Sequence, residues 1–132
     1  MVKKAKIIHL VTDSDSIVRL PQSIIVRNYV VSVISVSGFL KDWNPKKILY
    51  LCSDMCTDSI VGTEMRPVLC PLNLSVRKKN EINIDNIQNP IYVEVSCEEL
   101  RVFNLYICDE FGMKQSFENC KLNCSLLFIP VL

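Results

Sequence analysis

The chain has 132 residues, of which 49% are hydrophobic and 22% are charged, and its formal net charge is +1. These values suit one globular domain over residues 1–132 and exclude a disordered chain. A charge so close to zero gives no general drive toward nucleic acid or a membrane surface. The only basic clusters, Lys3, Lys4 and Lys6 and then Arg77–Lys79, are typical of solvated loops. The high apolar share indicates either a generous core or a surface reserved for partner proteins.

Neither a membrane span nor a signal peptide is expected. The longest apolar-rich stretch, Ile24–Leu40, is interrupted by Arg27, Asn28 and several serines. Residues 1–12 begin with basic residues but lack a long apolar segment and a small-residue cleavage site. Seven cysteines in such a chain indicate a reducing compartment, and their odd number argues against a complete disulfide framework.

Short β-strands follow one another along the chain, separated by turns that six prolines and three glycines punctuate. Ser23–Ser37 is dense in Val and Ile, which fit a pleated strand better than a helix. Cys120–Phe128 alternates apolar and polar residues, a period of two that a helix does not produce. In chain order, strands are expected over Ala5–Val11, Ser16–Leu20, Ser23–Ser37, Lys47–Cys52, Arg66–Val76, Asn80–Asp85, Ile91–Cys97, Arg101–Cys108 and Cys120–Phe128.

Two local signals lie near the last strands. Ser96 and Glu99 have the spacing of a capping box before Leu100, which predicts one short helical turn. Asp109–Met113 is expected to form the tip of a hairpin, with Gly112 supplying a positive φ. Roughly eight to ten short strands with at most one helical turn indicate an all-β fold, an antiparallel β-sandwich or jelly roll.

The residue types that carry catalysis are sparse. His9 is the only histidine and lies within the apolar segment Ile7–Val11, where a packed or edge position is its ordinary role. Carboxylates that are close in a turn are not thereby placed about a reacting bond. Such pairs occur at Asp13/Asp15, Asp54/Asp58, Glu98/Glu99 and Asp109/Glu110. Phosphate-binding, dinucleotide-binding and nucleophile-elbow motifs are absent from the sequence, so we expect no enzyme, no catalytic residue and no cofactor.

Two C-x3-C pairs, Cys52/Cys56 and Cys120/Cys124, are the best candidates for metal ligands. Four residues along a strand separate the Cα atoms by roughly 13 Å, which is too far for both thiolates to bind one zinc ion. Cys120 and Cys124 also share a face with apolar residues, so they are expected to be buried thiols. Zinc at Cys52 and Cys56 stays an open alternative because Ser53–Met55 could form a turn, but the main expectation is no metal site.

Several short motifs follow one another along the chain in a characteristic order. They are Ile48–Asp54 (ILYLCSD), Ser59–Gly62 (SIVG), Pro67–Leu69 (PVL), Pro90–Val95 (PIYVEV), Leu105–Gly112 (LYICDEFG), Ser116–Asn119 (SFEN) and Leu126–Phe128 (LLF). Over about residues 48–69 and 90–128 this series resembles the penton-type minor capsid proteins of Polinton/Maverick elements and the related adintoviruses. The chain departs from that family at Thr63, where Asp is frequent, and it lacks the long inserts of larger relatives.

The resemblance implies a single jelly roll of about eight antiparallel strands. It implies a virion protein that forms homopentamers at the five-fold vertices of a capsid, beside a double-jelly-roll major capsid protein. Synthesis would take place in the reducing cytoplasm or nucleus of a host cell. Asp54 and Gly62 would then shape loops without carrying out chemistry.

The segment Ser23–Ser37 is compatible with such an assembly because it is apolar on both faces. One face is expected to hold Tyr29, Val31 and Val33, and the other Val30, Ile34 and Val36. A strand of this kind is expected where one face packs in the core and the other meets a neighbouring subunit.

Three alternatives remain open. The same fold could serve as a capsid cement protein, or as a captured viral gene product that acts as a host adaptor. It could also bind a glycan or a small ligand, for which Trp43 is the one tryptophan available. The last alternative is a zinc-dependent binding module built on Cys52 and Cys56.

Overall fold

The computed structural model describes residues 4–12, 16–41, 48–72, 81–85 and 90–131, with the backbone alone at residues 85 and 118–121. In this part of the chain all regular structure is β-strand, and no helix is long and apolar enough to cross a membrane. The strands are β1 (Lys6–Val11), β2 (Ile17–Ile25), β3 (Tyr29–Leu40), β4 (Leu49–Ser53), β5 (Ser59–Val61), β6 (Glu64–Arg66), β7 (Val68–Leu72), β8 (Glu81–Asp85), β9 (Val93–Glu94), β10 (Glu99–Asp109) and β11 (Phe117–Pro130).

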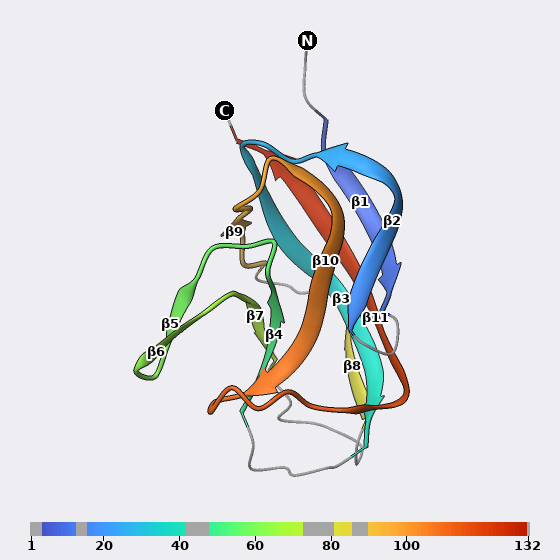
Figure 1. Ribbon diagram of the computed structural model, residues 1–132, viewed down its shortest axis with the longest axis vertical. Helices are drawn as coiled ribbons and strands as arrows, with labels where there is room; N and C mark the ends of the chain where they lie inside the picture. Colours follow the sequence, from blue (N-terminus) through green and yellow to red (C-terminus); the bar gives the residue numbers. More distant parts are fainter. Residues whose placement is uncertain (1–3, 13–15, 42–47, 73–80, 86–89, 132) are drawn as a thin grey trace.

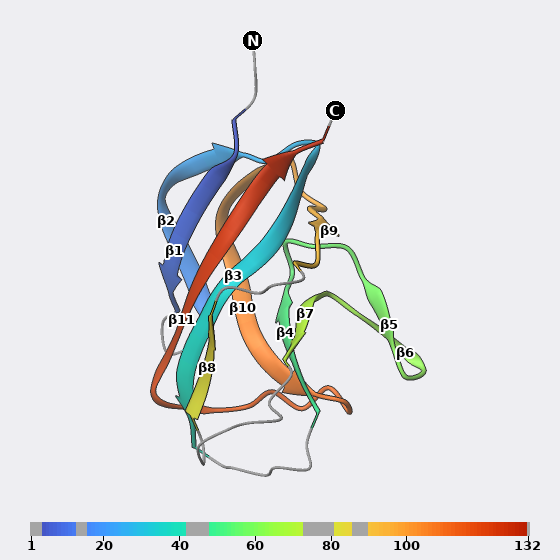
Figure 2. The ribbon, with the colours of Figure 1, turned by 180° about the vertical axis from the view of Figure 1, so that it is seen from behind.

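The strands form two main antiparallel sheets. The rear sheet has the order β1-β11-β3-β8, with β9 also paired to β3, and the front sheet has the order β2-β10-β4-β7. The front sheet lies before the rear sheet in Figure 1, and Figure 2 shows the pair from behind. This arrangement is consistent with a β-sandwich.

The core lies between the two sheets and takes alternate residues from each strand. Along β11, Leu122, Cys124, Leu126 and Phe128 are all buried, which confirms the alternation predicted for this segment. The front sheet contributes Leu51, Leu105 and Ile107, each 0% exposed. The apolar faces of both sheets are thereby removed from water, which is the main stabilising contribution to such a fold.

The segment expected as one strand over Ser23–Ser37 is in fact two strands in different sheets. Strand β2 ends at Ile25, and Asn28 adopts a φ of 61°, a left-handed conformation that asparagine tolerates better than most residues. The amide of Tyr29 donates to the carbonyl of Val26 at 3.1 Å and closes the turn. The chain then crosses to the rear sheet as β3.

A β-bulge in β3 corrects a second expectation. Ser35 pairs with Ser125 while Val33 pairs with the next residue, Leu126, so Ile34 is an extra residue in β3. The extra residue offsets the alternation by one position, and Val36 therefore faces the core with Val33 rather than the outer side. Tyr29, Val31 and Val33 are buried as predicted.

The helical turn expected at Ser96–Leu100 is wrong. Ser96 does not cap a helix, because its amide and hydroxyl donate to the carbonyl of Met55 at 2.8 and 3.1 Å. Glu99 instead begins β10, and the expected strand Ile91–Cys97 contracts to the two residues of β9. Pairing with distant segments has overridden the local capping signal.

Strands β5 and β6 form a hairpin, the arm (residues 59–66), that projects sideways from the sandwich in Figures 1 and 2. Its two-residue turn is Gly62–Thr63, and Gly62 has the positive φ, 63°, that such a turn requires at its first position. The arm packs back through Val61 onto the outer side of the front sheet, where Val61 shares a small apolar cluster with Cys52, Val68 and Cys108.

Candidate functional site: protein-binding surfaces

The single histidine lies on a sheet surface. His9 projects from the outer side of β1, and its Nδ1 is 2.7 Å from the hydroxyl oxygen of Ser125 on β11. Both side chains belong to a cross-strand pair of the rear sheet. The contact therefore joins two strands across an exposed sheet surface.

Two of the carboxylates singled out in the sequence, Asp54 and Asp109, hold nearby backbone amides. Asp54 accepts hydrogen bonds from the backbone amide and the side-chain amide of Asn104, at 2.9 and 3.1 Å. Asp109 is 3% exposed, and its Oδ1 accepts from the amides of Phe111 and Met113, both at 2.9 Å. These bonds satisfy the backbone of the turn that follows β10.

That turn, Asp109–Met113, has the expected conformation at Gly112, whose φ is 86°. It is closed by an isolated bridge between Cys108 and Lys114. It does not join a pair of hydrogen-bonded strands, because β10 belongs to the front sheet and β11 to the rear sheet.

The cysteines of the described residues are free thiols. The Sγ of Cys52 lies 3.4 Å from that of Cys108, while the Sγ of Cys56 donates to the carbonyl of Ser53 at 3.2 Å. Burial raises the pKa of Cys56 to about 11 and that of Cys124 to about 12. Because the thiolate is the form that binds metals and attacks electrophiles, these thiols are poorly suited to either task.

The described residues contain no group of three or more His, Cys, Asp or Glu side chains that could hold a metal ion. The thiol of Cys52 lies against that of Cys108, whereas the thiol of Cys56 donates to the carbonyl of Ser53, so the two do not point to one shared site. Several residues weighed in the sequence lie outside the described residues. They are Lys3, Asp13, Asp15, Trp43, Arg77, Lys78, Lys79 and the side chain of Cys120.

The first candidate surface is the outer side of β1, β11 and β3, here called the uncharged face. Its described apolar members are Ile7, Val11, Val30, Ile34, Phe39, Leu127 and Ile129, and its described polar members are His9, Ser32, Ser35, Ser37, Asn123 and Ser125. His9 is the only ionisable side chain among these members, but β9 brings Glu94 opposite Val30 and β8 brings Glu81 opposite Phe39, so acidic residues border the face. Protein surfaces normally carry roughly 25–35% charged residues, and a loss of charge marks the centre of an interface.

Pairing between strands makes the uncharged face continuous. Ile7 lies opposite Leu127, and Ile129 lies opposite Val30. Ile7 is 59% and Val11 53% exposed, whereas Val30 and Ile34 are half-buried, so the part of the face on β1 is the most open to solvent. The sequence pattern pointed to Val30 and Ile34 but could not show the contributions of β1 and β11, because strand register is not visible in it.

A second group of exposed apolar side chains, here called the arm patch, comprises Ile60 and Met65 of the arm and Phe111 and Met113 of the turn after β10. These four have the highest exposures among the large apolar side chains of the described chain, at 75, 61, 76 and 64%. Ile60 and Met65 are a cross-strand pair. Apart from Gly62 and Gly112, which form the two turns, nothing in the sequence pattern indicated this group.

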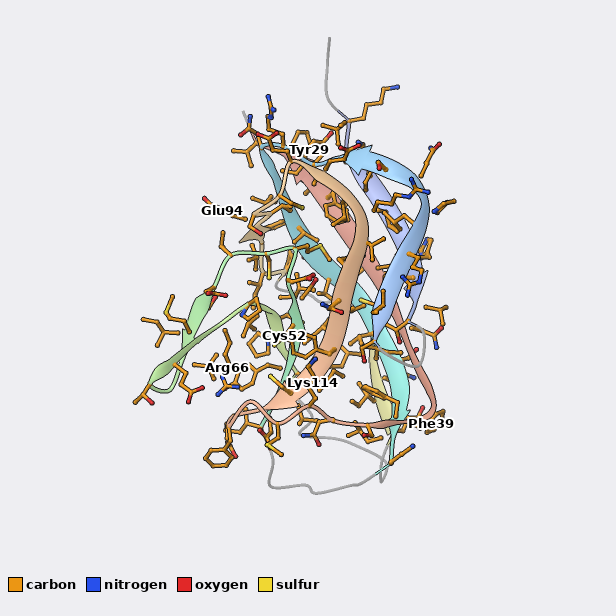
Figure 3. All side chains as sticks on the ribbon, in the orientation of Figure 1. Tyr29, Phe39, Cys52, Arg66, Glu94 and Lys114 are labelled. Carbon is orange, nitrogen blue, oxygen red and sulfur yellow. The ribbon has the colours of Figure 1, made fainter. Side chains whose placement is uncertain are left out.

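Arg66 holds the arm against this turn. Figure 3 shows its side chain reaching from β6 toward the segment after β10. Its Nη2 donates to the carboxylate of Glu64, and a Cβ on Gly112 would overlap its guanidinium group. A groove of about 420 Å³ remains between the two segments, lined in part by Arg66, Glu110 and Phe111. Because side chains alternate along a strand, Val61 and Arg66 face this turn, whereas Ile60 and Met65 lie on the opposite side of the arm.

Comparison with known proteins adds no identity: no protein-family model matches the chain, and no curated protein matches it.

Proposed function

We propose that this protein is a structural capsid protein, a single jelly roll that forms homopentamers at the five-fold vertices of an icosahedral particle. The uncharged face is the observation that carries the proposal, because an exposed sheet surface with few charged side chains over three adjacent strands fits contact with other proteins. No enzymatic role is proposed. The described carboxylates and thiols take part in turns and packing, as set out above.

The order of pairing supports the jelly-roll assignment. The first strand pairs with the last (β1 with β11), the second with the next to last (β2 with β10), β3 with β8 and β9, and β4 with β7. This is the pattern of one long hairpin whose two halves are rolled into two sheets, as in double-sheet jelly rolls. The arm lies at the closed end of that long hairpin, between β4 and β7.

Several of the motifs that carry the resemblance to penton-type proteins lie near one another in the fold. The segment Ile48–Asp54 spans β4, Gly62 forms the turn of the arm, and Pro67–Leu69 enters β7. Asp109 and Gly112 build the turn that packs on the arm. Motifs far apart in the sequence therefore meet at one end of the molecule.

A vertex protein needs three contact surfaces: two complementary patches for its neighbours in the ring and one for the surrounding shell. We assign the uncharged face to the shell, where the partner would be a double-jelly-roll major capsid protein. Its place of action would be the virion. The free thiols fit synthesis in the reducing cytoplasm or nucleus of a host cell.

Light scattering coupled to size-exclusion chromatography tests this function. A ring of five has a mass of about 75 kDa, five times the 15.1 kDa of one chain. A monomer at every concentration, with no affinity for a capsid partner, would remove the proposal. A monomer or dimer that does bind a capsid partner would favour the alternative role of a cement or adaptor protein.

A further inference from the structure

We propose that Cys52 and Cys108 are a redox-active pair, which a small-molecule disulfide such as oxidised glutathione converts into a disulfide bond joining β4 to β10. The arm covers the pair and controls access to it. Both thiols belong to one chain, so this inference does not depend on the ring proposed above.

The two cysteines lie diagonally across neighbouring strands, on the outer side of the front sheet. In the pairing of β10 with β4, Tyr106 is opposite Cys52 and Cys108 is opposite Tyr50. Leu51, the neighbour of Cys52 on β4, points instead into the core between the sheets. The two cysteines are 56 positions apart in the chain, yet their Sγ atoms are only 3.4 Å apart.

The two sulfur atoms need to move little to form a bond. The S–S distance of a disulfide is about 2.05 Å, so the separation of 3.4 Å has to shrink by about 1.4 Å. Rotation of the two side chains supplies part of this approach. Diagonal neighbours are farther apart than directly opposite residues, so the bond also draws β4 and β10 slightly together.

Other thiols of the described residues have different surroundings. The Sγ of Cys56, the cysteine nearest to Cys52 in the sequence, donates to a backbone carbonyl at 3.2 Å, and its side chain belongs to the main core. Cys70 and Cys124 also belong to the main core. Cys52 and Cys108 belong instead to the small apolar cluster outside it, which favours their pairing with each other.

The arm forms the cover over this pair. Val61 of the arm packs in the same cluster as the two thiols, and Cys52 lies between the arm and β10 in Figure 3. Cys52 is 0% and Cys108 2% exposed, so a dissolved disulfide reaches neither while the arm is in place. Burial also raises the pKa of Cys52, which keeps this thiol neutral and unreactive. A two-stranded hairpin is only marginally stable by itself, so the arm is the part of the cover that opens locally.

The bond forms through two thiol–disulfide exchanges. The thiolate of one cysteine attacks a sulfur of oxidised glutathione, forms a mixed disulfide and releases one glutathione thiolate. The thiolate of the other cysteine attacks the protein sulfur of that mixed disulfide, which closes the bond and releases the second glutathione. The two cysteines lose two electrons and two protons, which the two glutathione molecules carry away. A reducing compartment therefore keeps the pair as thiols, and an oxidising one closes the bond.

The test incubates the purified 132-residue chain with oxidised glutathione and maps linked peptides by mass spectrometry. We expect the loss of two thiols per chain, one intramolecular link between Cys52 and Cys108, and a Tm higher by about 5 °C or more, because the bond closes a long loop. Dithiothreitol should reverse these changes. Cys52→Ala and Cys108→Ala should each abolish the link, whereas Cys56→Ala, at a similarly buried thiol, is the matched control and should keep it.

Val61→Ala tests the role of the arm. Weaker packing of the arm on the cluster should speed formation of the bond by about fivefold or more, while Leu127→Ala on the uncharged face should leave the rate unchanged. Wild-type chains that keep all their thiols, carry glutathione without closing a link, or link other cysteines would overturn the pairing. Equal rates for Val61→Ala and the wild type would overturn the role of the arm.

Discussion

Gly112→Ala should destabilise the protein for two separable reasons. The glycine has a φ of 86°, a left-handed conformation that costs a residue with a Cβ about 1–2 kcal/mol. The new Cβ would also overlap the guanidinium group of Arg66 and push it away from the turn. The Arg66 side chain is only 13% exposed, so moving it disturbs packing as well as its ion pair with Glu64.

The expected loss of free energy of unfolding is the sum of the backbone cost at positive φ and the cost of displacing Arg66. The ion pair itself contributes little, because the Glu64 side chain is 66% exposed and solvent screens the interaction. We expect a total loss of about 2–3 kcal/mol, which for a chain of this size lowers Tm by roughly 7–10 °C.

Gly62→Ala is the matched control for the conformational part. Gly62 has a similar φ of 63°, but a Cβ there would meet nothing within 4 Å. Its substitution should cost only the conformational part, about 1–2 kcal/mol. The difference between the two variants measures the overlap with Arg66.

Thermal unfolding followed by circular dichroism gives the four stabilities that a double-mutant cycle needs, with Arg66→Ala as the second substitution. In the Arg66→Ala background, Gly112→Ala should cost about as much as Gly62→Ala does in the wild type. Equal losses of stability for the two glycine substitutions in the wild type would refute the packing of Arg66 against the turn at Gly112. So would an undiminished cost of Gly112→Ala after Arg66 is removed.

Three further predictions follow from burial and chemistry. Leu126→Ala should lower the free energy of unfolding, measured in urea, by about 2–5 kcal/mol, because Leu126 is 0% exposed. Leu127→Ala, on the uncharged face, should lower it much less. Similar losses for the two variants would contradict the assigned faces of β11. Burial raises the pKa values of Cys56, Cys70 and Cys124 to about 11 or 12, so stability under reducing conditions should be level below about pH 8 and fall above it as the unfolded thiols ionise first. Stability that rises from pH 8 to pH 10 would be inconsistent with buried neutral thiols. Elemental analysis should find no stoichiometric zinc, because Cys52 and Cys56 point to different partners, and one zinc per chain would revive the metal-binding alternative.

Alternation along single strands was the most informative signal in the sequence. It predicted the buried residues of β11 and the core positions Tyr29, Val31 and Val33 of β3, because side chains of a strand alternate whatever the strand pairs with. It failed at Val36, since a bulge depends on the register between β3 and β11. A single sequence does not contain that register in readable form.

The errors near the turns have a related cause. The capping spacing of Ser96 and Glu99 is a local preference, and hydrogen bonds to Met55 override it. Asn28 alone was a weak sign of a turn within a run of Val and Ile. The packing of the arm on the turn after β10 was missed for a stronger reason, because it brings together Arg66 and Gly112, which are far apart in the sequence.

Electron microscopy of the purified 132-residue protein tests directly whether it forms a five-membered ring. A vertex pentamer should give class averages of rings with five-fold rotational symmetry. Particles with two-fold or three-fold symmetry, or particles of monomer size at every concentration, would contradict it.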